Sequence, residues 1–158
     1  MRKVESDATT FVTSSEEAAA IRAAVVRRLI DEGFSRGRLE VVDEVVAEDI
    51  KEYQIRGPDH PSGRAGVRAV IGALRAGFSD FCLTIEDLAV AGDLVWTRNV
   101  ATGTNDGCFQ GHPPTGRPIR IAVFDVMRVI DGRIVEHWGL PDQMSLLSQL
   151  GVAAAARR

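Results

Sequence analysis

Cysteine is scarce in this 158-residue sequence. Cys82 and Cys108 are its only two cysteines, and they do not stand at the spacing of a metal site. A chain of this length can bury about two-thirds of its unfolded surface, so it needs no disulfide to hold it together. We therefore predict two reduced thiols and a cytoplasmic protein.

Long apolar runs and clustered basic residues are also missing. The N-terminus begins with Arg2 and Lys3, but no apolar segment follows, and no stretch approaches the ~18 apolar residues of a membrane span. The formal net charge is −3, and charges of both signs are scattered along the chain. Because no basic cluster is present to attract a phosphate backbone, we expect neither a membrane nor a nucleic acid as a partner.

The motifs that hold nucleotides, metals or a serine nucleophile do not occur either. The sequence has no GxGxxG or GxxxxGK loop, no His-x-x-x-His or Cys-x-x-Cys pair, and no nucleophile elbow. We therefore expect no cofactor and no bound metal. Acid–base chemistry in an apolar pocket is the type of reaction that remains.

Helical periodicity dominates the first half of the chain. We expect a single domain over residues 14–151, with flexible tails at 1–13 and 152–158. Ser14 followed by Glu17 forms a capping box, which predicts a first helix over about 15–32. Apolar spacing predicts further helices over 39–46 and 63–78, and Asp142 is placed to cap a last helix that ends at Leu150.

In the second half of the chain, the periodicity of strands replaces that of helices. One strand is expected at 50–55 and four more at 81–91, 94–102, 119–130 and 133–138. A change of alternation near Asp87 predicts a bulge, and Asp131-Gly132 predicts a two-residue hairpin turn. This order of elements predicts the α+β class, with helices packed on one face of a curved, mostly antiparallel sheet.

Asp125 is the most unusual residue of the longest strand. Alternation places it on one face with apolar residues only, which are Ile119, Ile121, Val123, Met127 and Val129. A buried carboxylate must be hydrogen-bonded, paired with a charge or protonated, and a desolvated carboxylate is a good candidate for a general base. The alternative is a structural aspartate that a backbone N–H or Arg98 satisfies.

Counting residue pairs back from the Asp131-Gly132 turn predicts which side chains share the face of Asp125. With a two-residue turn, Ile130 faces Arg133, and Asp125 then stands opposite Trp138. This pairing predicts an aromatic wall beside the acid, which suits a flat organic substrate. The same count places His137 on the other face, and a bulge would reverse that assignment.

The other two histidines lie in loops. His112 follows Gln110-Gly111 and precedes two prolines, so it stands in a rigid loop ahead of the long strand, from which it can reach a ligand. His60 lies between Asp59 and Pro61, and we expect it to be an ordinary loop residue.

A set of short motifs covers roughly residues 19–151. They are Ile85-Glu-Asp-Leu, Ala91-Gly-Asp-Leu-Val, Gly111-x-Pro-Pro-Thr-Gly116, Phe124-Asp-Val-Met-Arg, Asp131-Gly-Arg-Ile-Val-Glu-His-Trp138 and a closing Leu-x-Gln-Leu-Gly. Together they resemble the SnoaL-like polyketide cyclases, which have the cone-shaped α+β fold of nuclear transport factor 2 and ketosteroid isomerase. The resemblance implies a deep pocket between the helices and the concave sheet, and a small hydrophobic or aromatic substrate.

The resemblance also implies a reaction and residue roles. In these cyclases an aspartate on the long strand is the general base for aldol ring closure of an aromatic polyketide ester, and Asp125 occupies that position. A histidine ahead of this strand assists without any metal, and His112 matches it. The side chains that we expect to contact the substrate are Trp138, Tyr53, Trp96, Asn105, Met127, Arg98 and His137.

Two positions depart from the family pattern, since relatives commonly carry histidines where Tyr53 and Asn105 stand. The same fold also includes epoxide hydrolases with an Asp-Arg-Asp set, which Arg98 and Asp125 match in part. It includes non-catalytic binding and assembly modules as well. These functions remain alternatives to a cyclase.

The opposite face of the long strand is partly apolar. It carries Phe124, Val126 and Ile130 beside two arginines. An exposed apolar sheet face of this kind predicts a homodimer.

Overall fold

Helices fill the first half of the chain. The computed structural model describes residues 7–54 and 59–152, with side chains from residue 15 onward. Its helices are α1 (Asp7–Arg28), the π-helical η1 (Leu29–Ser35), α2 (Glu40–Val45), α3 (Gly63–Gly77) and α4 (Gln143–Leu150). The predicted helix start near residue 15 was wrong: no Pro or Gly interrupts residues 7–28, and the helix continues through them. The outer parts of the expected tails, 1–6 and 153–158, lie outside the described residues.

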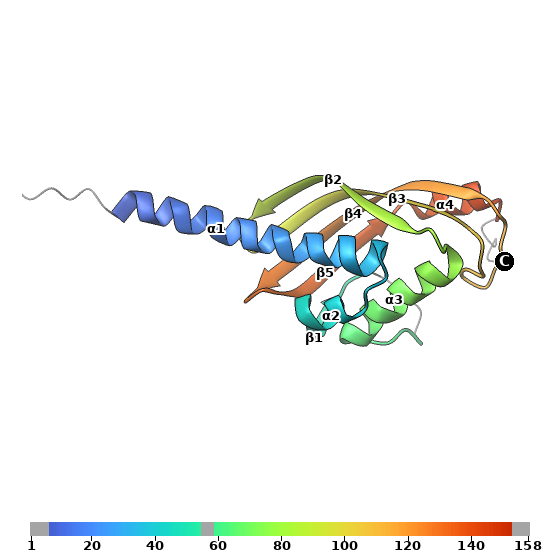
Figure 1. Cartoon of the computed structure of the whole chain (residues 1–158), viewed down its shortest axis with the longest axis horizontal. Coiled ribbons are helices and arrows are strands. Elements are labelled where there is room, and N and C mark those ends of the chain that lie inside the picture. Colours follow the sequence, from blue (N-terminus) through green and yellow to red (C-terminus); the bar gives the residue numbers. More distant parts are fainter. Residues whose placement is uncertain (1–6, 55–58, 153–158) are drawn as a thin grey trace, which may run out of the picture.

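Five strands form one curved sheet in the order β1-β5-β4-β3-β2 (Figure 1). Their bounds are Val46–Glu52, Cys82–Ala91, Leu94–Thr104, Pro118–Ile130 and Arg133–Pro141, for β1 to β5. β1 runs parallel to β5, and the other neighbours are antiparallel. The predicted α+β class is therefore confirmed, although β1 begins four residues earlier than predicted.

Local turn and cap signals also correspond to the structure. Asp131 and Gly132 have φ values of 48° and 73°, the positive values that a type I′ hairpin turn requires. The predicted bulge of β2 lies between Ile85 and Asp87. The Asp142 side chain caps α4 by accepting a hydrogen bond from the Ser145 amide at 3.0 Å.

The helices α1, α2 and α3 lie on one side of the sheet, and the core forms between the two layers (Figure 1). Its fully buried members come from every layer and include Val26, Ile30, Val41, Val42, Ile71, Phe78, Val95, Val129 and Ile134. Burial of each such side chain contributes about 1.5–3 kcal/mol, so this core fixes the helices against the sheet.

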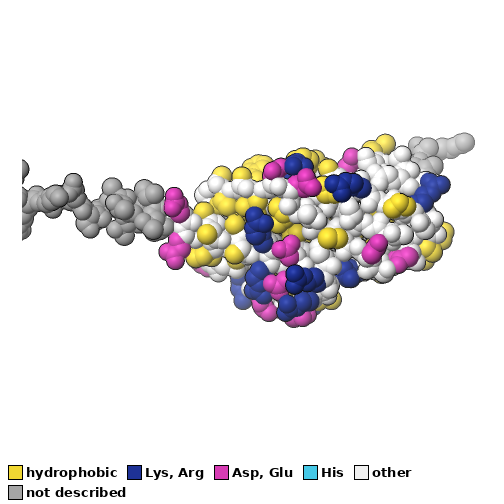
Figure 2. Space-filling view, turned by 45° about the horizontal axis from the view of Figure 1, so that its top comes forward, with side chains coloured by type: hydrophobic (Ala, Val, Ile, Leu, Met, Phe, Trp, Pro, Cys, Tyr) yellow, Lys and Arg dark blue, Asp and Glu magenta, His cyan; other side chains and the backbone are white. Residues whose placement is uncertain are grey.

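The outer surface mixes charged and apolar side chains. On the face shown in Figure 2, basic side chains lie among acidic ones. Cys82 and Cys108 are free, and both are exposed. Within residues 7–54 and 59–152, no helix combines the length and the apolar character needed to cross a membrane.

Candidate active site

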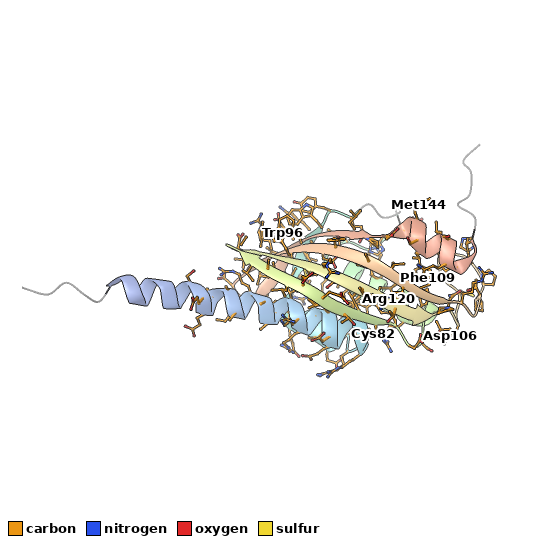
Figure 3. All side chains as sticks on the ribbon, turned by 90° about the horizontal axis from the view of Figure 1, so that it is seen from above. Cys82, Trp96, Asp106, Phe109, Arg120 and Met144 are labelled. Atoms are coloured by element: carbon orange, nitrogen blue, oxygen red, sulfur yellow. The ribbon has the colours of Figure 1, made fainter. Side chains whose placement is uncertain are left out.

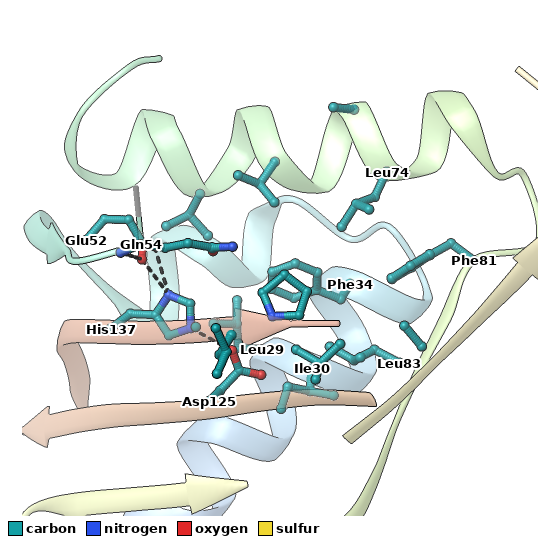
Figure 4. A pocket seen from close by; sticks show the side chains of 18 of the residues that line it. Leu29, Ile30, Phe34, Glu52, Gln54, Leu74, Phe81, Leu83, Asp125 and His137 are labelled. Atoms are coloured by element: carbon teal, nitrogen blue, oxygen red, sulfur yellow. Dashed lines mark hydrogen bonds and ion pairs between the residues drawn. The ribbon is translucent and has the colours of Figure 1, made fainter. Parts of the chain in front are cut away.

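A cavity of about 900 Å³ lies between the helices and the concave face of the sheet. η1 contributes Leu29 and Phe34 to its wall, and α3 contributes Leu74 (Figure 4). Val67 of α3 also lines the cavity. Pockets of this size and apolar character bind small organic molecules. The pocket expected between helices and sheet is therefore present and open.

The floor of the cavity is the inward face of β4. Asp125 lies on this floor and is only 7% exposed, with Val123 and Met127 as its neighbours on the same face. This placement follows from strand alternation and is the one that the sequence predicts. Met127 is also buried and lines the cavity.

Both carboxylate oxygens of Asp125 accept hydrogen bonds from side chains. His137 Nε2 lies 2.9 Å from Oδ1, and Asn99 Nδ2 lies 2.8 Å from Oδ2. The Asn99 amide also donates to Thr97 Oγ1 at 2.9 Å, while its own Oδ1 has no hydrogen-bond partner among the described residues. Flipping this amide would turn its oxygen toward a carboxylate, so the orientation with an unpaired oxygen is the one that stabilises an ionised Asp125.

Glu52, at the end of β1, holds the other side of the histidine ring. Its Oε1 and Oε2 lie 2.9 Å and 2.8 Å from His137 Nδ1. Burial lowers the pKa of His137, but hydrogen bonds from the ring to Asp125 and Glu52, together with their negative charges, raise it from 6.5 to about 9. The ring is therefore an imidazolium at neutral pH, which lets both nitrogens donate to carboxylates.

A bulge in β5 brings His137 into the cavity. Val129 pairs with Ile134, but Arg128 pairs with Glu136, so Val135 is an extra residue that shifts the register. Beyond it, His137 pairs with Met127 and faces inward. The predicted pairing of Asp125 with Trp138, which placed His137 outside, was wrong.

The residue that pairs with Asp125 is Gly139, and Trp138 pairs with Val126. A Cβ atom at Gly139 would lie 2.8 Å from His137 Cε1 and 3.0 Å from Asp125 Oδ1. Both distances are shorter than normal van der Waals contacts. The absence of a side chain at this position therefore allows the histidine and the aspartate to meet.

Comparison with known proteins shows the family of this chain. The sequence model of the SnoaL-like polyketide cyclases matches residues 24–150. The chain belongs to this family. Nogalonic acid methyl ester cyclase of Streptomyces nogalater is 29% identical over 120 residues, which are 75% of this chain and 89% of that one.

Two solved structures are similar to this chain in fold as well as in sequence. IdmH of Streptomyces antibioticus, a proposed polyketide cyclase, is 39% identical with a TM-score of 0.72, over 83% of this chain and 99% of that one. TsrD of Streptomyces laurentii is 26% identical with a TM-score of 0.76, over 84% and 96% of the two chains. The predicted cone-shaped α+β fold is thus the fold of this chain.

Three of the expected substrate contacts of this SnoaL-like chain lie on the outer face of the sheet. Trp96 is 51% exposed, and Arg98 pairs there with Asp87 and Glu86. Trp138 stacks on Tyr53 with ring centroids 4.7 Å apart and planes 6° apart. Tyr53 borders both this outer surface and the cavity, so of these four residues it is the one that can contact a molecule bound in the cavity.

The loop before β4 has a structural part and an exposed part. Asn105 is buried, where its Nδ2 donates to the Gly77 and Gly107 carbonyls and its Oδ1 accepts from Thr115. His112 is exposed, and its backbone pairs with that of Phe109. Neither Asn105 nor His112 lines the cavity, so the structure does not bring them to Asp125.

Sequence reasoning missed several residues of the site. Alternation along β3 already places Asn99 inward, so this signal was available. Glu52 meets His137 through the parallel pairing of β1 with β5, which no local pattern reveals. His60 lines the cavity rather than being an ordinary loop residue. Among the described residues, no group of three His, Cys, Asp or Glu side chains is placed to hold a metal ion.

Proposed function

We propose that this chain is a cofactor-independent cyclase that closes a ring in a polyketide-like substrate by general-base catalysis, with Asp125 as the base. The observation that carries the proposal is a buried carboxylate on the floor of a large apolar cavity, bonded to His137 and Asn99. Each carboxylate oxygen accepts one bond in this arrangement and keeps a lone pair for a substrate proton.

The reaction needs only this carboxylate and two carbonyl groups of the substrate. Asp125 takes a proton from a carbon next to a carbonyl, and the C–H electron pair forms an enolate. The enolate carbon attacks a second carbonyl carbon of the same molecule, so a C–C bond forms and the carbonyl oxygen becomes an alkoxide. The alkoxide takes the proton back from Asp125, and the product is an isomer of the substrate.

His137 and Glu52 prepare the base for this step. The imidazolium orients the Asp125 carboxylate by donating to its Oδ1. Glu52 balances the imidazolium charge from the far side, so the cation is shared between two carboxylates. His137, rather than His112, is thus the histidine that we assign to the site.

The arrangement favours this function over the alternatives. An epoxide hydrolase of the Asp-Arg type would need an arginine beside the acid, and Arg98 lies on the opposite face with Asp87. A binding module was expected to have a narrow or filled pocket, with Asp125 paired with Arg98 or a backbone amide, whereas Asp125 bonds to His137 and Asn99. A cavity of about 900 Å³ with the acid on its floor supports catalysis instead.

We also propose that the protein is a cytoplasmic homodimer. Two free, exposed thiols suit a reducing compartment. The outer face of the sheet exposes Trp96, Phe124 and Leu140 around a shallow groove, which a second copy of the chain would cover.

The test of the base is Asp125→Asn, which keeps the shape of the side chain and removes its basicity. We expect turnover of a polyketide ester that the wild type cyclises to fall at least ~100-fold. Asp87→Asn is the matched control, because Asp87 is an exposed aspartate on the outer face. Unchanged turnover in the Asp125 variant would remove the proposed mechanism.

A further inference from the structure

The polar side chains of the cavity are confined to parts of its wall. Glu52, Gln54, His137 and Asp125 gather at one end (Figure 4). The His60 side chain lies beside Gly66, and Gly66 belongs to the N-terminal half of α3. Gln110 and Gln143, which also line the cavity, are exposed at its rim and bond to each other at 3.1 Å.

Apart from Tyr53, which follows Glu52 in the chain and bonds to Glu136, the rest of the described lining is an apolar trough. Its floor runs along β4 from Asp125 through Val123 and Ile121 to Ile119. At about 3.3 Å per residue, these positions extend ~20 Å along the strand. The opposite wall carries Val67, Val70 and Leu74 of α3, and Phe78, Phe81 and Phe109 also line the trough.

Among the described residues, the β4 floor beyond Asp125 and the α3 wall offer no side-chain partner to the oxygen atoms of a substrate. The backbone groups of this floor are already paired in the sheet. Each carbonyl or hydroxyl group buried there without a partner weakens binding by about tenfold or more. Trp138, predicted to form an aromatic wall beside the acid, and Trp96, an expected substrate contact, both lie outside the cavity.

We propose that the substrate has an oxygen-poor hydrocarbon body, and that its oxygens cluster around the reacting carbon near Asp125. This inference rests on the proposed function for the position of the reacting carbon. A substrate with such a body differs from polyhydroxylated aromatic polyketides, whose oxygens are spread over the whole molecule. Alkyl chains and reduced or polyene-like polyketide chains belong to the proposed class.

The test is calorimetric binding of methyl 3-oxoalkanoates of about six to fourteen carbons. Each added CH₂ group should tighten binding by up to about fourfold until the trough is full. The chain-matched ester with two carbonyl groups in its distal half should bind about tenfold weaker or worse. Affinity that does not depend on chain length would overturn the inference, and so would equally tight binding of the oxygenated ester or a trihydroxyanthraquinone.

A pair of isosteric variants locates the effect in the trough. Val123→Thr places a hydroxyl on the cavity floor, while Val126→Thr places one on the outer face of the same strand. We expect roughly fourfold weaker binding of the long-chain ester by Val123→Thr and wild-type binding by Val126→Thr. Equal effects of both variants would contradict the assignment.

The Asp125→Asn variant tests this inference independently of the proposed function, because binding of the hydrocarbon body of the substrate does not require a base. The chain-length series is therefore measured on this variant too. If the dependence on chain length holds but Asp125→Asn retains full turnover, the substrate class stands and the mechanism fails. If turnover is lost but chain length has no effect in either protein, the mechanism stands and the substrate class fails.

Discussion

His137 Nε2 lies 2.9 Å from Asp125 Oδ1, and this contact depends on one extra residue in β5. Without the bulge at Val135, alternation would turn the imidazole to the outer face and Trp138 toward the cavity. One inserted residue therefore decides whether the acid has a cationic or an aromatic neighbour. The consequences of this pairing can be tested at several positions.

Gly139→Ala should disturb the pair directly. The added methyl group would lie 2.8 Å from His137 Cε1, so the ring or the carboxylate must move. A displacement of about 1 Å at a catalytic group can lower the rate on the order of 100-fold. We expect a loss of this size in turnover, measured with a substrate that the wild type cyclises.

Gly72→Ala is the matched control, because a Cβ at this exposed position of α3 meets no atom within 4 Å. Alanine in a helix is up to about 1 kcal/mol more favourable than glycine, so this variant should be active and at least as stable as the wild type. Full turnover of Gly139→Ala would mean that the His137–Asp125 contact does not matter for the reaction.

Glu52→Gln should change how His137 titrates. This variant removes one of the two carboxylates that raise the pKa of His137 to about 9, so the pKa should fall toward 6.5. The alkaline limb of the rate profile should move to lower pH with it, because the imidazolium forms over a narrower range. NMR titration of the ring and the pH dependence of kcat/KM measure the two effects separately.

Glu86→Gln is the control for this change, since Glu86 pairs with Arg98 on the outer face. It should leave the titration of His137 unaltered. An unshifted His137 in Glu52→Gln would show that the Glu52 carboxylate does not hold the charge of the ring.

The sequence predicted the parts of the site that local patterns determine. Alternation of period two placed Asp125 inward, and the residue types of Asp131-Gly132 and Asp142 specified a turn and a cap. The position of His137 could not be predicted in the same way. Val135 is an ordinary β-branched strand residue, and nothing in its type marks it as the extra residue of a bulge.

Contacts between distant segments were also beyond the reach of sequence patterns. Glu52 and His137 are 85 positions apart and meet only because β1 pairs in parallel with β5. Asn105 was one of the side chains expected to contact the substrate. Its hydrogen bonds to Gly77, Gly107 and Thr115 instead bind the loop to the end of α3.

The stability of the fold should depend on pH through His137. Its pKa is raised from 6.5 to about 9 in the folded state, so the stabilisation is fully present below pH 6.5 and is lost as pH rises to about 9. The free energy of unfolding should fall by on the order of 3 kcal/mol over this pH range. Urea unfolding at pH 6 and pH 9 should show a less stable protein at the higher pH.

His137→Gln isolates this contribution from other groups that titrate near pH 9. The variant should be less stable than the wild type at pH 6, because Asp125 and Glu52 then face each other without a cation. Its stability should change less between the two pH values. An equal pH dependence in both proteins would assign the effect to other groups.

The outer face of the sheet should mediate dimerisation. Phe124 is 51% exposed there, and Phe124→Glu would bury an unpaired carboxylate in the interface. We expect sedimentation velocity to give a dimer for the wild type and a monomer for this variant at micromolar concentration. Met144→Glu is the control, because Met144 is 73% exposed on α4, well away from Trp96 (Figure 3). A monomeric wild type, or a dimeric Phe124→Glu, would exclude this face as the interface.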